Sequence, residues 1–377
     1  MKDWRPENPF STAAYYGPAY FCDRQEEADQ ILRNITGGSS TTLMAIRRIG
    51  KTGLMHHVIS RLPRGWTGIY ADIQETENMN QFLNLLVAAI LQSSSEKSTV
   101  GKKLWKFIAS LRPLISFDPL TGLPQVTFDV KQPASENNIQ QVFLFLEKQD
   151  FKSLIVIDEF QQIISYPEKN MDAWLRARVQ QLKNVVFVFT GSQQHLMTEL
   201  FTSPNRPFFR STQIMKLGKL NPGIYRDFIM AMFQKYKKKI SPEIASDILN
   251  WAGIHTYYVQ HLCNRVFTAT AKEVTAEIWK QQAHQVLKEE ENVFFAFRNM
   301  LTRPQWNLLK AIAREGQVYQ PTSKDFIRKF DLGSSATVLR SLKTLQDYEL
   351  VYHDYTGDGI KYLSVYDVFF QRWTETR

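Results

Sequence analysis

The sequence predicts an α/β domain built on a parallel sheet, followed by an all-helical domain and a small C-terminal domain of three helices and a β-hairpin. Three observations lead to this prediction. Short, continuous apolar runs alternate with helix-like segments over the first two-thirds of the chain. From about Lys216 to about residue 290, only helical patterns follow. Near the C-terminus, three further helical patterns precede two β-prone runs.

The α/β domain is predicted over residues 1–215. Its strand-length runs are bounded by polar turns, as expected for strands buried on both faces of a sheet, and lie at 41–45, 68–72, 153–157 and 185–190. Residues 54–62 and 80–91 carry apolar side chains at helical spacing. The pattern weakens between 93 and 135, where residues 114–130 are typical of a β-hairpin with a turn near 119–122. We expect this hairpin to be a peripheral insertion without chemistry of its own.

The helical domain is predicted over residues 216–290. Asn221 followed by Pro222 is a typical helix start, and it opens a helical pattern at 223–234. Ser241 and Pro242 repeat this device before 243–252, and a third helix is expected at 257–272.

The C-terminal domain, predicted over residues 291–377, has the layout of a winged helix. Helices are expected at 304–314, with Thr302 as its cap, at 323–330 and at 334–347. Two β-prone runs, 351–355 and 360–365, flank a turn at 356–359. In the third helix we expect four apolar side chains to face inward: Val338, Leu339, Leu342 and Leu345.

Bulk composition excludes several classes of protein. Two cysteines, Cys22 and Cys263, are too few for a disulfide framework or a zinc site built on thiolates. The N-terminus lacks the layout of a signal peptide, and no apolar run approaches membrane-spanning length, so a soluble, cytoplasmic protein without a membrane partner is expected. The net charge of +9 favours an anionic partner, although the lysine-rich run at 235–239 is also typical of a solvated helix face.

A phosphate-binding loop is predicted at residues 45–52, which read A-I-R-R-I-G-K-T. This run fits G-x-x-x-x-G-K-[ST] except at Ala45, and it lies between an apolar strand and a helix. In such a loop, backbone N–H groups surround the phosphates, the lysine reaches the β- and γ-phosphates, and the hydroxyl binds Mg²⁺. Those roles fall to Lys51 and Thr52. The predicted nucleotide-binding residues of the loop are Ala45, Arg47, Arg48, Ile49, Gly50, Lys51, Thr52 and Gly53.

A second motif supports the first. Residues 154–159 read L-I-V-I-D-E, a buried strand that ends in two carboxylates, and ligands of α/β folds bind at that end of the strands. Asp158 is predicted to hold Mg²⁺ through water, and Glu159 to orient or polarise the water that attacks the γ-phosphate. The strand at 184–190 is followed by a T-G-S sequence, in which Thr190 or Ser192 is a candidate γ-phosphate sensor and an ordinary turn is the alternative.

The order of these segments resembles the archaeal-type ATPase family, in the STAND branch of the AAA+ P-loop ATPases. The resemblance rests on F-C-D-R-Q-E-E at 21–27, R-R-I-G-K-T at 47–52, I-D-E-F at 157–160 and T-G-S at 190–192. It implies that Phe21, Asp23 and Arg24 line the pocket for the nucleotide base. It also implies that Arg210 acts on the γ-phosphate, with Arg206 as a rival, and Arg176 and Arg178 stay open as further candidates.

Two further segments resemble the same family. G-I-H-T-Y-Y at 253–258 is similar to a segment of the family's helical lid, with Thr256 in place of a proline. Y-D-V-F-F-Q-R-W at 366–373 is similar to the stretch that closes the winged helix. The resemblance therefore covers nearly the whole chain.

Three functions remain open at this point. The chain is either an ATP-binding, slowly hydrolysing molecular switch, a DNA-binding ATPase that uses its winged helix, or a nucleotide-binding structural module with little turnover. Residues 301–377 carry 11 Lys and Arg against 9 Asp and Glu, and this near neutrality favours a protein partner over DNA. ATP or ADP and Mg²⁺ are the predicted ligands. An oligomer is compatible with the sequence.

Overall fold

The computed structural model describes residues 5–12, 15–93, 99–128, 132–356 and 358–376. The chain divides into two compact units. Ala14–Gly218 form the first, and Lys219–Arg377 together with Met1–Ala13 form the second. The further division of the helical region at residue 290 stays a prediction.

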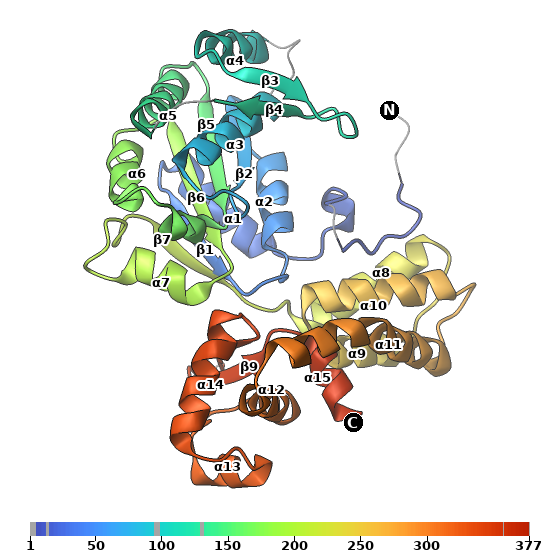
Figure 1. The fold of residues 1–377 in the computed structure, drawn as a ribbon. Coiled ribbons are helices and arrows are strands. Elements are labelled where there is room, and N and C mark those ends of the chain that lie inside the picture. Colours follow the sequence, from blue (N-terminus) through green and yellow to red (C-terminus); the bar gives the residue numbers. More distant parts are fainter. Residues whose placement is uncertain (1–4, 13–14, 94–98, 129–131, 357, 377) are drawn as a thin grey trace. The chain divides into compact units, whose positions relative to one another are not determined.

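The first unit is built on a five-stranded parallel sheet with the strand order β2-β5-β6-β1-β7 (Figure 1). Its strands are β1 (Thr41–Ala45), β2 (Trp66–Asp72), β5 (Lys152–Asp158), β6 (Val185–Gly191) and β7 (Gln213–Leu217). Its helices are η1 (Pro18–Tyr20), α1 (Gln25–Thr36), α2 (Lys51–Ser60), α3 (Met79–Gln92), α4 (Thr99–Ser110), α5 (Gln132–Glu147), η2 (Phe160–Ser165), α6 (Met171–Val179) and α7 (Gln194–Thr202).

The apolar runs of the sequence form the buried centre of this sheet. Every residue of β1 and β6 is buried, and β5 is exposed only at Lys152, so the prediction of parallel strands covered on both faces is confirmed. Strand β7 was not predicted, because as an edge strand it alternates exposed and buried residues and has no continuous apolar run. The all-helical region therefore begins after β7 rather than at Lys216.

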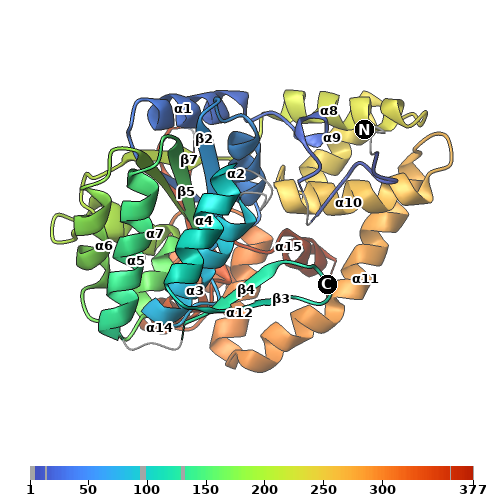
Figure 2. The same ribbon diagram turned by 90° about the horizontal axis from the view of Figure 1, so that it is seen from above.

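Helices cover both faces of the sheet (Figures 1 and 2). Helices α1 and α2 lie on one face, whereas α3, α5 and α7 lie on the other. The second face holds the main core of the unit, in which Phe187 and Phe189 of β6 pack with Phe143 of α5 and Phe201 of α7. These aromatic contacts stabilise the sheet whose strand ends carry the loops of the site.

An insertion between β2 and β5 leaves the sheet and returns. It contains α4 and the antiparallel hairpin of β3 (Leu114–Phe117) and β4 (Pro124–Thr127), so the predicted hairpin is confirmed, while its residues 129 and 130 lie outside the described part. The backbone of Asp118 closes the turn with Leu123, and Leu120 at the tip is 95% exposed. Helix α4 was not predicted, although Leu104 and Ile108 lie four residues apart on its buried face.

The second unit is mainly helical. Its elements are α8 (Pro222–Lys235), α9 (Pro242–Trp251), α10 (Thr256–Ala269), α11 (Ala276–Met300), α12 (Arg303–Glu315), α13 (Lys324–Phe330), α14 (Ser335–Asp347), β8 (Val351–Tyr355), β9 (Lys361–Val365) and α15 (Val368–Glu375). The predicted caps Asn221 and Ser241 are confirmed, because each side chain accepts a hydrogen bond from the first turn of its helix. Thr302 is confirmed as the N-cap of α12, where its N–H donates to Oε1 of Gln305 in a capping box.

Two features of this unit are unexpected from the sequence. The N-terminal segment belongs to it, since Phe10 is fully buried between Phe233 and Phe267. Part of the lysine-rich run at 235–239 has a local role, because Lys238 donates a hydrogen bond to the carbonyl of Phe267 and lies over its ring.

The last elements form the predicted winged-helix layout, in which β8 and β9 pair antiparallel after α12, α13 and α14. One prediction here is wrong. Leu339 is 57% exposed and does not face inward, because it lies beside the buried stripe of α14, which consists of Val338, Ser341, Leu342 and Leu345. Gly357 of the predicted turn lies outside the described residues. Over the described part of the chain, no helix combines the length and apolar character needed to cross a membrane.

Candidate functional site

The parallel strands end at one edge of the sheet, and the predicted motifs meet there. Asp72 at the end of β2 pairs in register with Asp158 at the end of β5, and Met44 near the end of β1 pairs with Gly191 of β6. Strand β6 lies between β5 and β1, so the T-G-S sequence falls between the other two motifs.

The loop at residues 45–52 has the local conformation that its sequence demands. Gly50 directly precedes α2 and has φ 99°, a left-handed backbone that favours glycine. Ala45 is a regular, buried residue of β1 paired with Leu217, and its φ is not positive. A glycine is therefore not needed at this first position of the motif.

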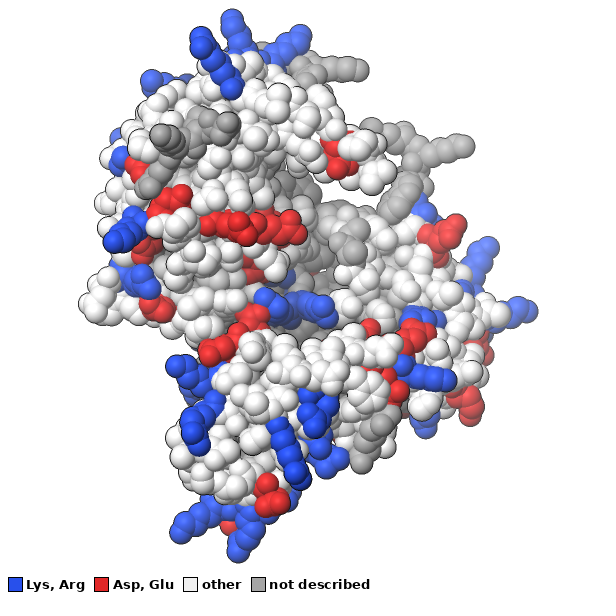
Figure 3. All heavy atoms as spheres, in the orientation of Figure 1, with Lys and Arg blue, Asp and Glu red and all other residues white. Residues whose placement is uncertain are grey.

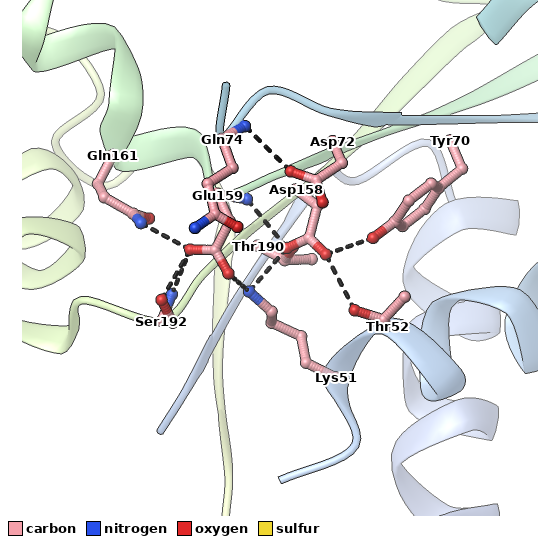
Figure 4. Close-up of polar contacts among 10 residues, drawn as sticks. All are labelled: Lys51, Thr52, Tyr70, Asp72, Gln74, Asp158, Glu159, Gln161, Thr190 and Ser192. Carbon is pink, nitrogen blue, oxygen red and sulfur yellow. Dashed lines mark hydrogen bonds and ion pairs between the residues drawn. The ribbon is translucent and has the colours of Figure 1, made fainter. Parts of the chain in front are cut away.

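Lys51 begins α2 and lies between the two acidic side chains (Figure 4). Its Nζ is 2.7 Å from Oδ1 of Asp158 and 2.6 Å from Oε1 of Glu159, and its side chain is largely buried. Burial alone would lower the pKa of Lys51, but the two carboxylates raise it above its ordinary value, so the ammonium group is charged.

Asp158 is enclosed by donors. Besides Lys51, its carboxylate accepts hydrogen bonds from the hydroxyls of Thr190 and Tyr70, and from Thr52 Oγ1 at 3.2 Å. Burial would raise the pKa of Asp158, but Lys51 and the hydroxyl donors hold it below its ordinary value. The result is an ionised carboxylate in contact with the hydroxyl of the phosphate loop.

Glu159 follows in a left-handed conformation, with φ 55°, and caps the start of η2. Its Oε2 accepts hydrogen bonds from Gln161 Nε2 at 2.6 Å, from Ser192 Oγ at 2.7 Å and from Ser192 N at 3.1 Å. Burial would raise the pKa of Glu159, but Lys51 and Gln161 hold it below its ordinary value. Ser192, one of the two candidate sensors, thus contacts Glu159, and Thr190, the other, contacts Asp158.

Three side chains of this site were not predicted. Tyr70 of β2 binds Asp158, His56 of α2 packs on Tyr70 with ring centroids 4.7 Å apart, and Gln161 binds Glu159. The sequence offers one signal for Tyr70. It lies two residues before Asp72, so the two polar side chains lie on the same face of the strand. Nothing in the sequence distinguishes Gln161 from its neighbour Gln162.

Phe21, one of the predicted base-pocket residues, lies beside the start of α2. The ring of Phe21 stacks on His57 of α2 at 4.5 Å, and a Cβ at Gly53 would lie 3.4 Å from it. Asp23 and Arg24 both have positive φ, 53° and 65°, which turns the chain into α1.

Arg24 is nearly buried, and its guanidinium group donates to Glu27 and to the carbonyl of Gly218, the latter at 2.6 Å. The side chains of Arg47 and Arg48 are exposed on the phosphate loop, and Ile49 between them and Gly50 is buried.

Arg206 and Arg210 make no ion pair or hydrogen bond to the site carboxylates among the described residues, and Arg178 lies over the ring of Trp174. Arg206 pairs with Glu199 and with Asp172. Arg210 lies over the ring of Phe209, and its described contacts do not include Lys51, Asp158 or Glu159.

Taken together, the geometry provides a helix N-terminus with a lysine, an adjacent hydroxyl, and two carboxylates at the carboxyl edge of a parallel sheet (Figure 4). Such an edge binds anionic groups of a ligand through backbone N–H groups and the lysine. The described residues contain no group of three or more His, Cys, Asp or Glu side chains that could hold a metal ion by themselves. A cation at this site would therefore take further oxygen ligands from water or from a bound substrate.

The fold is shared with solved structures of low sequence identity. A Walker-type ATPase of Pyrococcus abyssi is 14% identical, with a TM-score of 0.69 over 97% of this chain and 99% of that chain. The ORC2 protein of Aeropyrum pernix, solved as ADPNP-ADP complexes, is 11% identical, with a TM-score of 0.60 over 98% and 96%. The ORC1 protein of Aeropyrum pernix, solved in complex with DNA, is 12% identical, with a TM-score of 0.54 over 98% and 96%. No curated protein matches the sequence.

Two family models match the sequence itself. A probable winged helix domain matches residues 292–376, which agrees with the predicted C-terminal layout. An ATPase domain predominantly from Archaea matches residues 21–262, which include the phosphate loop, both carboxylates and the segment around Phe21. The P-loop AAA+-like fold and the family predicted from the sequence are thus confirmed. The chain belongs to the family of ATPase domains found predominantly in Archaea.

Proposed function

We propose that this protein binds ATP with Mg²⁺ at residues 45–53, hydrolyses it slowly, and uses the cycle as a nucleotide-dependent molecular switch of the STAND type. The observation that carries the proposal is the position of Lys51, at the start of the helix after β1 and in contact with both Asp158 and Glu159.

Lys51 is the phosphate ligand in this proposal. Its ion pairs with Asp158 and Glu159 place the ammonium group between the loop and the catalytic carboxylates. The β- and γ-phosphate oxygens of ATP compete with those carboxylates for the same ammonium group, and the N–H groups at the start of α2 bind the remaining phosphate oxygens.

The residues present fit Mg²⁺, because Thr52 Oγ1 and Asp158 Oδ2 are oxygen donors only 3.2 Å apart, and oxygen is the ligand that Mg²⁺ prefers. The charges of Lys51, Asp158 and Glu159 sum to a negative value, so a polyanionic nucleotide requires a compensating cation here. Bound with ATP, Mg²⁺ would be held by Thr52 and, through water, by Asp158, and would neutralise phosphate charge.

Glu159 is the residue we assign to the attacking water. Its carboxylate is ionised and fixed by donors, so it can accept a hydrogen bond from water and orient it toward the γ-phosphate. Slow turnover is expected because Arg206 pairs with Glu199 and Asp172, and the guanidinium group of Arg210 lies over the ring of Phe209. Without an arginine at the γ-phosphate, hydrolysis loses about 10³–10⁵ in rate.

The switch is supported by the segment that precedes α1. Phe21, Asp23 and Arg24 are the proposed contacts to the nucleotide base, and Arg24 also holds the carbonyl of Gly218. Gly218 is the last residue of the first unit, where the chain passes into the second. A nucleotide that reorders residues 21–24 would therefore act on this connection.

The test compares wild-type protein with Glu159→Gln. Both are expected to bind ATP equally, and the variant should lose turnover by about 10²–10⁴, as is typical when a general base is removed. Steady-state phosphate release and equilibrium binding of a fluorescent ATP analogue measure the two properties. If the variant hydrolyses ATP as fast as wild type, the role of Glu159 is refuted. If wild type binds ATP but does not turn it over, a nucleotide-binding structural module replaces the ATPase.

DNA binding is a second candidate function, favoured by one observation. Lys and Arg side chains gather over α13 and α14 (Figure 3). These two helices carry Lys324, Arg328, Lys329, Arg340 and Lys343 against Asp325 and Asp347. A winged helix that reads DNA places such a helix in the major groove. The near neutrality of residues 301–377, with 11 Lys and Arg against 9 Asp and Glu, favours a protein partner instead, and we retain that preference.

A salt titration separates the two partners. Duplex DNA of mixed sequence should bind weakly, and Arg340→Ala with Lys343→Ala should leave that weak binding little changed if the partner is a protein. Micromolar or tighter binding with a steep dependence on salt, lost in the double variant, would establish DNA as the partner of this domain.

A further inference from the structure

We propose that Gln161 is a positioning residue for Glu159: its side-chain amide holds one carboxylate oxygen, so that the other faces Lys51 and the phosphate loop. The inference rests on the proposed ATPase function, because it concerns the residue to which that function assigns the attacking water. Gln161 itself contacts neither the loop nor Lys51 (Figure 4).

The two oxygens of Glu159 have different surroundings. Oε2 accepts three hydrogen bonds, from Gln161 Nε2 at 2.6 Å and from the hydroxyl and backbone N–H of Ser192. Oε1 contacts Lys51 Nζ at 2.6 Å. The carboxylate plane is therefore fixed from one side, and Oε1 is the oxygen turned toward the nucleotide site.

The side chain of Gln161 packs against Gly191, which has no side chain of its own. Its side chain folds back from η2 against β6 and is only 6% exposed. A Cβ at Gly191 would lie 2.4 Å from Oε1 of Gln161, closer than real atoms approach. Glycine at position 191, directly before Ser192, thus makes room for the amide that binds Glu159.

The hydrogen bond to Glu159 determines which way the amide of Gln161 is oriented. Oε1 of Gln161 is buried and has no hydrogen-bond partner among the described residues. A buried acceptor without a partner is unfavourable, and such groups in native structures call for an explanation. The opposite orientation of the amide would place this oxygen against the Glu159 carboxylate. Contact with the carboxylate therefore fixes the donor end where it lies.

This arrangement has a consequence for catalysis. When ATP phosphates bind Lys51, Oε1 of Glu159 exchanges its lysine contact for water, while Oε2 keeps its three donors. Gln161 and Ser192 then keep the carboxylate from rotating, and misplacement of a catalytic group by about 1 Å lowers rates by about 10²-fold. Gln161 acts through Glu159 and touches no substrate.

The test uses Gln161→Met, which keeps the length of the side chain and removes its donor. Turnover should fall about tenfold or more while the ATP dissociation constant stays within about twofold, because ground-state binding does not involve Glu159 Oε2. Gln162→Met is the matched control. Gln162 lies next in the same helix and donates to the carbonyl of Thr76 at 2.9 Å, away from Glu159. This control should keep turnover within about twofold of wild type, as expected for a residue outside the catalytic group.

A double variant shows whether Gln161 acts through Glu159. Once Glu159→Gln is present, adding Gln161→Met should cause no further loss of turnover, because the two residues act as one unit. Equal losses in Gln161→Met and Gln162→Met, additive losses in the double variant, or unchanged turnover in Gln161→Met would each overturn the proposal. Gln161→Asn, which keeps the amide but shortens the reach, should behave as Gln161→Met and serves if that variant does not fold. Absence of turnover in wild type would refute the ATPase function itself.

Discussion

Gly50 and Ala45 occupy the two positions where the phosphate-loop motif normally has glycine, and the structure treats them differently. Gly50 has φ 99°, which a side chain would strain, whereas Ala45 continues a buried strand. The motif's departure at Ala45 therefore leaves the loop's conformation unaffected. The steric demand of the loop falls on Gly50.

Gly191 allows a prediction about stability. An alanine there would place its Cβ 2.4 Å from Oε1 of Gln161 and 2.5 Å from Sδ of Met197, inside a fully buried strand. We expect Gly191→Ala to lower the free energy of unfolding by about 1–3 kcal/mol, as overpacking does. Gly218→Ala is the control, because a Cβ there meets nothing within 4 Å and φ is not positive. Urea unfolding measures both variants, and equal stability of the two would contradict the packing at Gly191.

At the scale of elements, α14 shows what the sequence pattern missed. Its apolar residues predict a four-residue inner stripe, but Leu339 lies 57% exposed and Leu345 is fully buried. We expect Leu345→Ala to cost about 2–5 kcal/mol of unfolding free energy. Leu339→Ala should change it by about 0.5 kcal/mol or less. Thermal unfolding of the two variants decides, and a larger loss in Leu339→Ala would show that this residue packs in the core.

The sheet was predictable where its strands are central. Strands β1, β5 and β6 are apolar because both faces are covered, and that burial leaves a continuous run in the sequence. Edge strand β7 carries no such run, since three of its five residues are exposed. Caps such as Asn221 and Ser241 were predictable because they depend on contacts only two or three residues away.

The site was predictable only in part, for a related reason. Lys51, Asp158 and Glu159 belong to motifs whose order along the chain is informative. Tyr70 enters the site through strand register, which brings together residues 88 positions apart. Gln161 lies only two residues from Glu159, and the turn into η2 sets the direction of its side chain. No local pattern records such contacts.

At the scale of the whole molecule, the chain passes twice between its two units, near residues 13 and 218. The first passage lies close in sequence to the proposed base-pocket residues 21–24. The second ends at Gly218, whose carbonyl accepts a hydrogen bond from Arg24. Phe10 packs on Phe233 and Phe267 within the second unit, whereas the contact between Arg24 and Gly218 lies within the first. A nucleotide bound between the phosphate loop and residues 21–24 would thus be positioned to influence both connections. Native mass with and without a non-hydrolysable ATP analogue would show whether that influence extends to assembly.

The most direct measurement of the central claim is equilibrium binding of a fluorescent ATP analogue, in the presence of Mg²⁺, to wild type, Lys51→Ala and Lys152→Ala. Lys152 is the first residue of β5 and therefore lies at the amino ends of the strands, where it lies over the ring of Trp66. We predict saturable binding to wild type and to Lys152→Ala, and an affinity lower by about 100-fold or more in Lys51→Ala. A charge-assisted contact to phosphate contributes about 1.5–3 kcal/mol, and its removal also leaves Asp158 and Glu159 facing the phosphates. Equal affinities for wild type and Lys51→Ala would contradict the assignment of this loop as the nucleotide site.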